Sequence, residues 1–242
     1  PKRPKVIFSS NAMYHNEGYK FWAAEKIEKG CVMVATPHGG CYGSSLCNFL
    51  ESHEIKLADK YFSWGWKVKG QGGVIPLPSG KLAAIKNRIR SLGDGRILWG
   101  GISLPRYSLC LYSSLLGPQL VDYIRGQEEF VQLLLPDVRK LMLMRLHFDD
   151  QDWGEKERWF DFDPDLEVYR AGEIPIYDHL NKSRLYIATY NGTSFLETFV
   201  ANFPTILFWN PGHWELRPQA QPFYDELRKV GILHDLPESA AT

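Results

Sequence analysis

The sequence predicts an α/β fold in which parallel strands form two Rossmann-like halves. Short apolar runs, typical of buried strands, alternate along the chain with stretches whose apolar residues recur at helical spacing. The first third has a β-α-β-α-β pattern, and a Gly- and Pro-rich stretch without periodicity, 70–80, follows it. We therefore expect an amino-terminal lobe over residues 1–80 and a carboxyl-terminal lobe over 81–242.

Composition and charge narrow the class of protein. The chain has 242 residues, of which 44% are hydrophobic and 23% charged, so it can bury a globular core. Lys plus Arg and Asp plus Glu number 28 each, and without a basic excess we expect no nucleic-acid partner. No apolar run approaches the roughly 20 residues that span a bilayer. The four cysteines lack the close pairs of a zinc site, which indicates thiols in a reducing, cytoplasmic compartment.

The periodicity locates the expected elements. The expected strands are 5–9, 31–35, 60–66, 96–103, 140–146, 185–188, 204–209 and 232–234. The expected helices are 18–29, 44–57, 118–135, 176–180, 220–230, a terminal one from 237, and one that begins at Thr193 or Ser194. The acidic and aromatic stretch 149–165 is expected to be a loop.

The segment 184–217 is the most informative part of the chain. It contains a β–turn–α–β unit whose polar turn, 189–194, follows the apolar run 185–188. Open parallel sheets bind ligands at the carboxyl ends of their strands, and a helix amino terminus there suits a phosphate or carboxylate. The alternative is that Asn191 and Gly192 form only a tight turn and Thr193 only a helix cap.

Two motifs of the amino-terminal lobe carry candidate catalytic groups. His38 precedes Gly39-Gly40, and these glycines allow a ligand to approach the backbone, so His38 can act as a base or hold a phosphate. A Gly-rich turn with a surface histidine explains the motif equally well. Glu51 and Glu54 share a helix face, and a carboxylate near His38 would orient it or act as a general base. The alternative is a solvated helix surface.

The third polar turn contains Arg145 and His147, followed by Asp149, Asp150 and Asp152. An arginine and a histidine at a strand end supply charge and hydrogen bonds for a diphosphate or carboxylate. Three aspartates also suggest a metal, but the loop lacks the glycine and glutamate positions of an EF-hand. We therefore interpret these aspartates as a solvated acidic loop and expect no metal.

The fourth turn places Glu197 one helical turn after Thr193 and Ser194. Glu197 can accept hydrogen bonds from the hydroxyls of a ribose, or it can reach back to Ser194 or Thr193 in a capping box. The following strand leads into a segment dense in large polar and aromatic side chains, which predicts a pocket wall. The residues expected in that wall are Tyr42, Trp209, His213, Trp214, Glu215 and Arg217. Signatures of P-loop ATPases, dehydrogenases, zincins and serine hydrolases are absent from the sequence.

YNGTSFLETFVANFPTILFWNPGHWELR, with HGGCYG, ESHE and YFSWGW, resembles the carboxyl-terminal part of a transferase family first named from Leptospira. Members of that family accompany bacterial surface-polysaccharide genes, and the resemblance covers nearly the whole chain. They are usually much longer, and this chain opens at Pro1 without an initiator methionine. We therefore expect a fragment with an incomplete amino-terminal lobe.

The turn pattern is similar to that of GT-B glycosyltransferases, particularly the capsule and lipopolysaccharide enzymes that use CMP-Kdo. The resemblance implies that Gly192, Thr193 and Ser194 contact the donor phosphate, next to Asn191. It also implies that Arg145 and His147 flank this phosphate, that Glu197 binds the ribose, and that His38 and Glu51 face the acceptor. The chain has Arg-Leu-His at 145–147 where the Kdo enzymes tend towards a His-Pro pair, so the donor stays open.

The expected function is metal-independent transfer of a sugar from a nucleotide sugar to a surface glycan. The nucleotide sugar is a substrate, and no cofactor is expected. The expected partners are this donor and a glycan or lipid-linked acceptor, with peripheral association at the inner face of the bacterial inner membrane. The alternatives are a nucleotide-sugar epimerase or hydrolase, and a non-catalytic lobe that binds a nucleotide or a partner.

Overall fold

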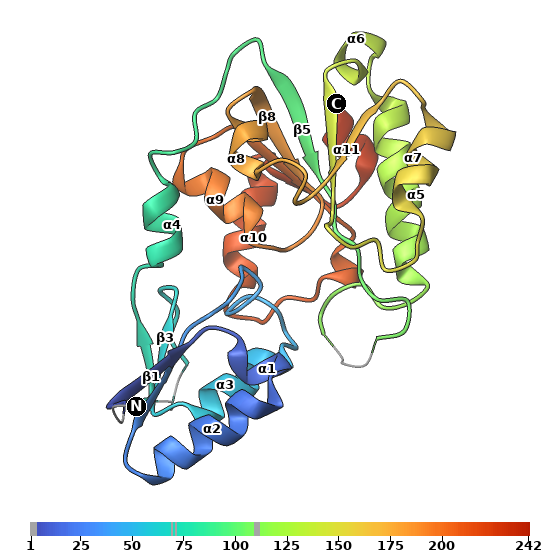
Figure 1. Ribbon diagram of the computed structural model, residues 1–242. Helices are drawn as coiled ribbons and strands as arrows, with labels where there is room; N and C mark the ends of the chain where they lie inside the picture. Colours follow the sequence, from blue (N-terminus) through green and yellow to red (C-terminus); the bar gives the residue numbers. More distant parts are fainter. Residues whose placement is uncertain (1–3, 69, 71, 109–111) are drawn as a thin grey trace.

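The structure is a computed structural model that describes residues 4–68, 70, 72–108 and 112–242. Two parallel sheets form two lobes, the amino-terminal one below the carboxyl-terminal one in Figure 1. The predicted α/β class with two parallel sheets is therefore confirmed. The predicted division at residue 80 falls between the last strand of the first sheet and the first strand of the second.

The amino-terminal sheet has the strand order β1-β2-β3-β4, and all neighbouring pairs are parallel. Its strands are β1 Val6–Ser9, β2 Val32–Ala35, β3 Lys60–Ser63 and β4 Val74–Pro76. Its helices are α1 Ala12–His15, α2 Glu17–Glu28 and α3 Phe49–Leu57. Asn48 caps α3 by accepting a hydrogen bond from the Glu51 backbone N–H at 3.1 Å.

The carboxyl-terminal sheet has the order β10-β9-β8-β5-β6-β7, again parallel throughout. Its strands are β5 Arg96–Gly100, β6 Met142–Leu146, β7 Glu167–Arg170, β8 Ser183–Ala188, β9 Thr205–Phe208 and β10 Leu233–His234. Renumbered from β5, this is the 3-2-1-4-5-6 order of a doubly wound dinucleotide fold. The order reverses between β5 and β8, so ligands are expected at the carboxyl ends of these two strands.

Helices cover both faces of the second sheet (Figure 1). The helices of this lobe are α4 Gly80–Ile85, α5 Gln119–Leu133, α6 Pro136–Arg139, α7 Glu155–Phe162, α8 Ile176–Leu180, α9 Ser194–Val200, α10 Gln221–Lys229 and α11 Pro237–Ala241, with a 3-10 turn at Pro211–His213. Side chains of β5 alternate between the faces: Leu98 packs in the cluster of Phe195, and Trp99 in the cluster of Phe130. The sheet therefore lies between two apolar layers.

Some expected elements differ from the structure. The loop expected over 149–165 is wrong in part because α7 forms within it, where Trp159 packs edge-on against Trp99 at 5.6 Å. The helix expected from residue 44 begins at Phe49, because 45–48 forms bridges with the carboxyl-terminal lobe. Neither of the short strands β4 and β7 is among the expected elements.

Candidate functional site

A cavity of about 510 Å³ lies between the two lobes, at the carboxyl ends of β5 and β8. The turn after β2 and the turn after β8 face each other across it. Its walls comprise His38–Tyr42, Ser45, Asn48 and Leu50 from the first lobe, and Ile102, Leu104, Tyr112–Ser114, His147, Tyr190–Ser194, Glu197 and Trp214 from the second. The cavity therefore occupies the position where the strand order predicts a ligand.

Glycines let the two turns meet. The Gly40 backbone N–H donates to Thr193 Oγ1 at 3.0 Å. A Cβ atom on Gly40 would lie 2.2 Å from the Gly192 carbonyl oxygen, so no larger residue fits there without movement. Thr193 makes no side-chain cap of α9, because its hydroxyl bonds to the other lobe instead. Thr193 therefore occupies the N-cap position of α9, while its hydroxyl serves the contact between the lobes.

The other polar side chains of the turn after β8 are bonded within the protein. Asn191 is buried, donates to Ser44 Oγ at 3.3 Å and accepts from the Tyr224 hydroxyl at 2.8 Å. Ser194 Oγ accepts from the Tyr186 hydroxyl at 2.7 Å. A ligand next to this turn would therefore meet its backbone, because these side chains already have partners.

Glu197 lies on the cavity wall, and its side chain pairs with Lys81 of α4. The Lys81 Nζ is 2.9 Å from Glu197 Oε1, and Glu197 is only 5% exposed. Since this carboxylate pairs with Lys81, the capping box with Ser194 or Thr193 is not formed. Neither lysine nor arginine is among the described residues that line the cavity.

Glu51, expected to be catalytic, forms an ion pair between the lobes and does not line the cavity. Its carboxylate accepts from the Gly43 backbone N–H, and Arg217 Nη2 lies 2.7 Å from its Oε1. Arg217 also donates to the Ser45 carbonyl oxygen, and its guanidinium lies 5.6 Å from the ring centre of Trp66. We call the contacts of Gly40, 43–45 and Glu51 with Gly192, Thr193 and 216–217 the interlobe joint.

Glu54 lies on the same buried face of α3 as Glu51. Burial raises the pKa of Glu54 to about 8, and the neighbouring Glu51 charge adds to this, whereas the nearby Tyr42 hydroxyl opposes it. Tyr42 itself lines the cavity, and burial raises its pKa well above the usual value. At neutral pH both groups are therefore largely uncharged.

Arg145 and His147 follow one another on β6 and its loop but have different surroundings. The Arg145 guanidinium donates to the Ile174 carbonyl oxygen at 2.7 Å, does not line the cavity, and has its pKa lowered by burial. His147 lines the cavity, and its Nδ1 lies 2.9 Å from the Asp149 carbonyl oxygen. The Asp149 backbone nitrogen also lies 3.4 Å from Nδ1, so the Asp149 backbone fixes the position of the ring at the cavity wall.

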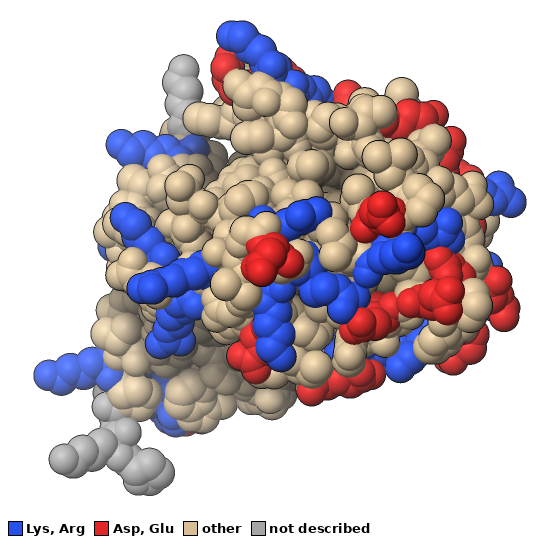
Figure 2. All heavy atoms as spheres, turned by 90° about the horizontal axis from the view of Figure 1, so that it is seen from above, with Lys and Arg blue, Asp and Glu red and all other residues tan. Residues whose placement is uncertain are grey.

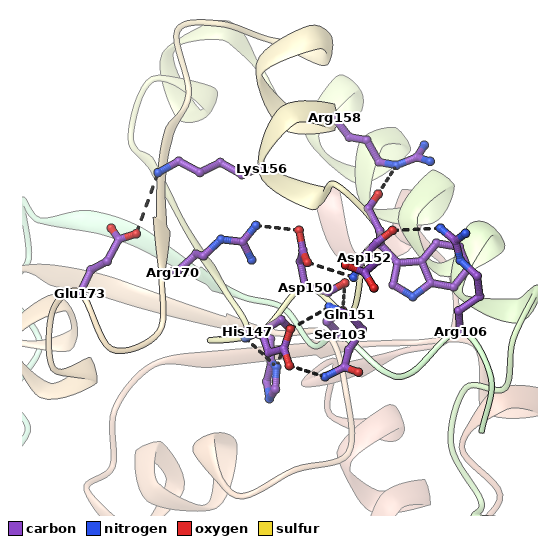
Figure 3. A network of polar contacts seen from close by, with 12 residues as sticks. Ser103, Arg106, His147, Asp150, Gln151, Asp152, Lys156, Arg158, Arg170 and Glu173 are labelled. Carbon is purple, nitrogen blue, oxygen red and sulfur yellow. Dashed lines mark hydrogen bonds and ion pairs between the residues drawn. The ribbon is translucent and has the colours of Figure 1, made fainter. Parts of the chain in front are cut away.

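The loop after β6 is held rigidly by polar contacts (Figure 3). Asp150 accepts from Arg170 at 2.9 Å through its carboxylate, and its carbonyl oxygen accepts from Ser103 Oγ at 2.9 Å. Gln151 and Asp152 have positive φ angles of 53° and 63°, a conformation that costs energy outside glycine. Asp149 and Asp152 are exposed, as expected for a solvated acidic loop, whereas Asp150 is half-buried and its pair with Arg170 helps to hold the loop that carries His147.

The remaining expected residues divide between the cavity and other places. His38 is exposed on the cavity wall, and Trp214 is buried beside it. Trp209 packs in the apolar core, and His213 lines a different cavity of about 230 Å³ next to α5. Glu215 contacts the first lobe through its carbonyl oxygen, which accepts from the Leu46 N–H at 3.0 Å. Of the six residues expected in the pocket wall, Tyr42 and Trp214 line the cavity, whereas Glu215 and Arg217 join the lobes.

Several residues of the cavity wall are not among the site residues expected from the sequence. Tyr190, Tyr112, Ser113 and Ser114 belong to the cavity, and Lys81 reaches it through Glu197. Tyr190 lies within the expected polar turn, so the strand-end argument could have included it. The segment around Tyr112 has no strand or helix pattern, and only the fold brings it to the first lobe.

The surface seen in Figure 2 has acidic and basic side chains interspersed, without one continuous basic patch. Among the described residues, no helix has the length and apolar character needed to span a bilayer. In the same part of the chain, no group of three or more His, Cys, Asp and Glu side chains is placed to hold a metal ion.

The sequence matches the family described as LIC12162 family transferase over residues 1–242. The chain belongs to this transferase family. Its fold is similar to the crystal structure of a protein from Listeria monocytogenes proposed to be a UDP-N-acetylglucosamine 2-epimerase, with a TM-score of 0.51 and 11% identity. The alignment covers 98% of this chain and 63% of that protein. No match was found among curated proteins.

Membership of the transferase family confirms the expected resemblance, and the structural similarity supports a GT-B-like arrangement of two Rossmann-like lobes. At 11% identity the similarity concerns the fold alone. The expected similarity to CMP-Kdo enzymes stays a prediction. The site residues also stay predictions, although His38, His147, Glu197 and the turn after β8 do meet at one cavity.

Proposed function

We propose that this transferase is a glycosyltransferase that moves a sugar from a nucleotide sugar to a surface-glycan acceptor without a metal ion. The observation that carries the proposal is the cavity at the switch point of the second sheet, closed on its other side by the first lobe. A cavity of about 510 Å³ falls within the range of small-molecule sites. The family supports transfer chemistry, and the fold supports a nucleotide-sugar substrate.

In this proposal the donor lies against the turn after β8. The first N–H groups of α9 have no partner within the helix, so they and the Gly192 backbone meet the phosphate charge. Glu197 accepts hydrogen bonds from the ribose, while Lys81 balances its charge. His147 adds a further contact from β6, whereas Arg145 would first have to leave the Ile174 carbonyl.

The acceptor approaches from the first lobe, where His38 takes the proton of its attacking hydroxyl. The acceptor oxygen bonds to the anomeric carbon while the bond from this carbon to the phosphate oxygen breaks. Glu51 is not assigned as the base, because Arg217 and Gly43 occupy its carboxylate. The acceptor is a glycan or lipid-linked chain, and the protein works peripherally at the cytoplasmic face of the inner membrane.

Titration calorimetry with UDP, GDP, CDP and CMP tests the donor site. We expect one of these nucleotides to bind in the presence of EDTA, and His38→Ala to bind it equally well. With the matching nucleotide sugar and acceptor, His38→Ala should transfer sugar about a hundredfold more slowly. His213→Ala, outside the cavity, is the matched control and should keep its rate. If no nucleotide binds, the donor site is refuted.

A second candidate function is epimerisation or hydrolysis of a nucleotide sugar, which the structural similarity to the Listeria protein favours. Such an enzyme consumes its substrate without an acceptor. NMR of the nucleotide sugar incubated with the protein alone therefore separates the two functions. Under the glycosyltransferase proposal the nucleotide sugar stays unchanged until an acceptor is added.

A further inference from the structure

We propose that a groove on the amino-terminal lobe binds an acidic oligosaccharide. The groove has a volume of about 630 Å³ and lies between α1, α2 and α3. It meets the interlobe cavity at Asn48, which lines both. The identification of this oligosaccharide as the acceptor chain depends on the proposed function, but the binding itself does not.

A line of aromatic rings runs from the groove into the cavity. The ring centres of Tyr14 and Phe49 are 5.4 Å apart, and those of Phe49 and Tyr112 are 4.7 Å apart. Tyr14 and Phe49 line the groove, whereas Tyr112 lines the cavity. All three side chains are half-buried, so part of each remains accessible. Large flat rings of this kind suit the apolar C–H faces of pyranose sugars.

The outward face of α3 supplies polar and basic groups along the same groove. Phe49, Ser52, His53 and Lys56 follow the spacing i, i+3, i+4, i+7, which places them on one helix face. Ser52, His53 and Lys56 are exposed and can bond to sugar hydroxyls and carboxylates. An extended saccharide would therefore find rings and hydrogen-bonding groups side by side.

The charge of the groove favours an anionic sugar chain. Neither aspartate nor glutamate is among its described lining residues, which include Lys20, Lys56 and His53. Lys20 pairs with Glu17 at 2.6 Å, but Lys56 forms no ion pair among the described residues. The groove therefore carries a basic side chain whose charge is not balanced locally. A lipid tail would instead need walls without these polar groups.

Calorimetric titration with two hexasaccharides tests this inference, namely hexagalacturonate, which is acidic, and maltohexaose, which is neutral. We expect the acidic chain to bind about tenfold more tightly, with an affinity that falls as salt is added. Phe49→Ala should weaken it about five- to tenfold by removing the central ring. Lys56→Gln should weaken it about threefold, while Lys60→Gln, an exposed lysine outside the groove, should leave it unchanged.

Absence of binding by hexagalacturonate, equal binding of both chains, or equal losses in Lys56→Gln and Lys60→Gln would each overturn the inference. Because Phe49 packs against two rings, circular dichroism melting must show that Phe49→Ala is folded. If it is not, Lys56→Gln and His53→Ala decide the question, since both positions are exposed.

Nucleotide titrations of the same variants separate this inference from the proposed function. We expect the groove variants to bind nucleotide like the wild type, because the groove does not include the turn after β8. If the wild type binds hexagalacturonate but no nucleotide, the proposed function is refuted and oligosaccharide binding in the groove is supported. If it binds nucleotide but no hexagalacturonate, oligosaccharide binding in the groove is refuted and the proposed function is supported.

Discussion

The two faces of α3 have opposite surroundings although they come from the same four-residue motif, ESHE. Glu51 and Glu54 point inwards and are only 4% and 3% exposed. Ser52 and His53 point outwards and are exposed along the groove. The inner face holds the interlobe joint through Arg217, whereas the outer face offers polar groups to a ligand.

This contrast predicts that substitutions on the two faces of α3 affect different properties of the protein. A buried ion pair loses most when one partner is removed, because the other charge stays buried without compensation. Exposed polar groups contribute little to stability, so they are free to serve recognition. Changes to the inner face and the joint should therefore affect folding, and changes to the outer face should affect binding alone.

The largest expected effect is that of Arg217→Ala. It leaves the buried Glu51 carboxylate without its partner and removes the bonds to Ser45, which should lower the free energy of unfolding by about 3–5 kcal/mol. Urea denaturation measures this change. Arg125→Ala, which breaks an exposed pair with Asp122, is the control. Equal stabilities of the two variants would show that the joint is not a major source of stability.

Gly40→Ala tests the close approach of the two turns in the joint. The new Cβ would lie 2.2 Å from the Gly192 carbonyl oxygen, so we expect a loss of about 2 kcal/mol in thermal or urea unfolding. Gly126→Ala in α5 has open space at the Cβ and should stabilise the protein by about 1 kcal/mol. If Gly40→Ala has the same free energy of unfolding as the wild type, the two turns can separate without cost.

Glu54→Gln should have an effect that depends on pH. The folded pKa of Glu54, about 8, exceeds the ordinary value of 4.5 for a glutamate, so the wild type loses stability as pH rises from about 4.5 to 8. The glutamine variant lacks this loss. The free energy of unfolding of Glu54→Gln, relative to that of the wild type, should rise across that range by on the order of 2 kcal/mol and stay constant above it. Melting temperatures of both proteins from pH 5 to 9 measure the difference, and parallel curves would contradict it.

The smallest expected effects are those of His53→Ala and Lys56→Gln on the outer face of α3. Both side chains are exposed, so each variant should unfold within about 0.5 kcal/mol of the wild type. Urea denaturation under the conditions used for Arg217→Ala provides the measurement. A decrease in the free energy of unfolding as large as that of Arg217→Ala would contradict the difference between the two faces.

Much of the fold and part of the site could be predicted because they depend on local patterns. Apolar runs and helical spacing identify the parallel strands, and polar turns at strand ends identify His38, His147, Glu197 and the turn after β8. Besides α7, the short elements α1, α4, α6, β4 and β7 are absent from the expected elements. In α7, charged residues surround a single large buried anchor, Trp159, so no apolar periodicity reveals the helix.

The rest depends on contacts between distant segments. Glu51 and Arg217 are 166 positions apart, so no local pattern pairs them, and Glu51 resembles a catalytic carboxylate until Arg217 is placed. Likewise, Lys81 meets Glu197 only when α4 packs beside α9. The sequence therefore identifies which residues are polar and near strand ends, whereas the fold decides which of them stay available to a ligand.

A crystal structure with the bound nucleotide tests the central claim most directly, namely that the cavity between the lobes is a nucleotide-sugar site. We expect the phosphate against the backbone of Gly192 and the start of α9, and the ribose hydroxyls within hydrogen-bonding distance of Glu197. A nucleotide bound elsewhere, such as in the cavity beside His213, would contradict the account.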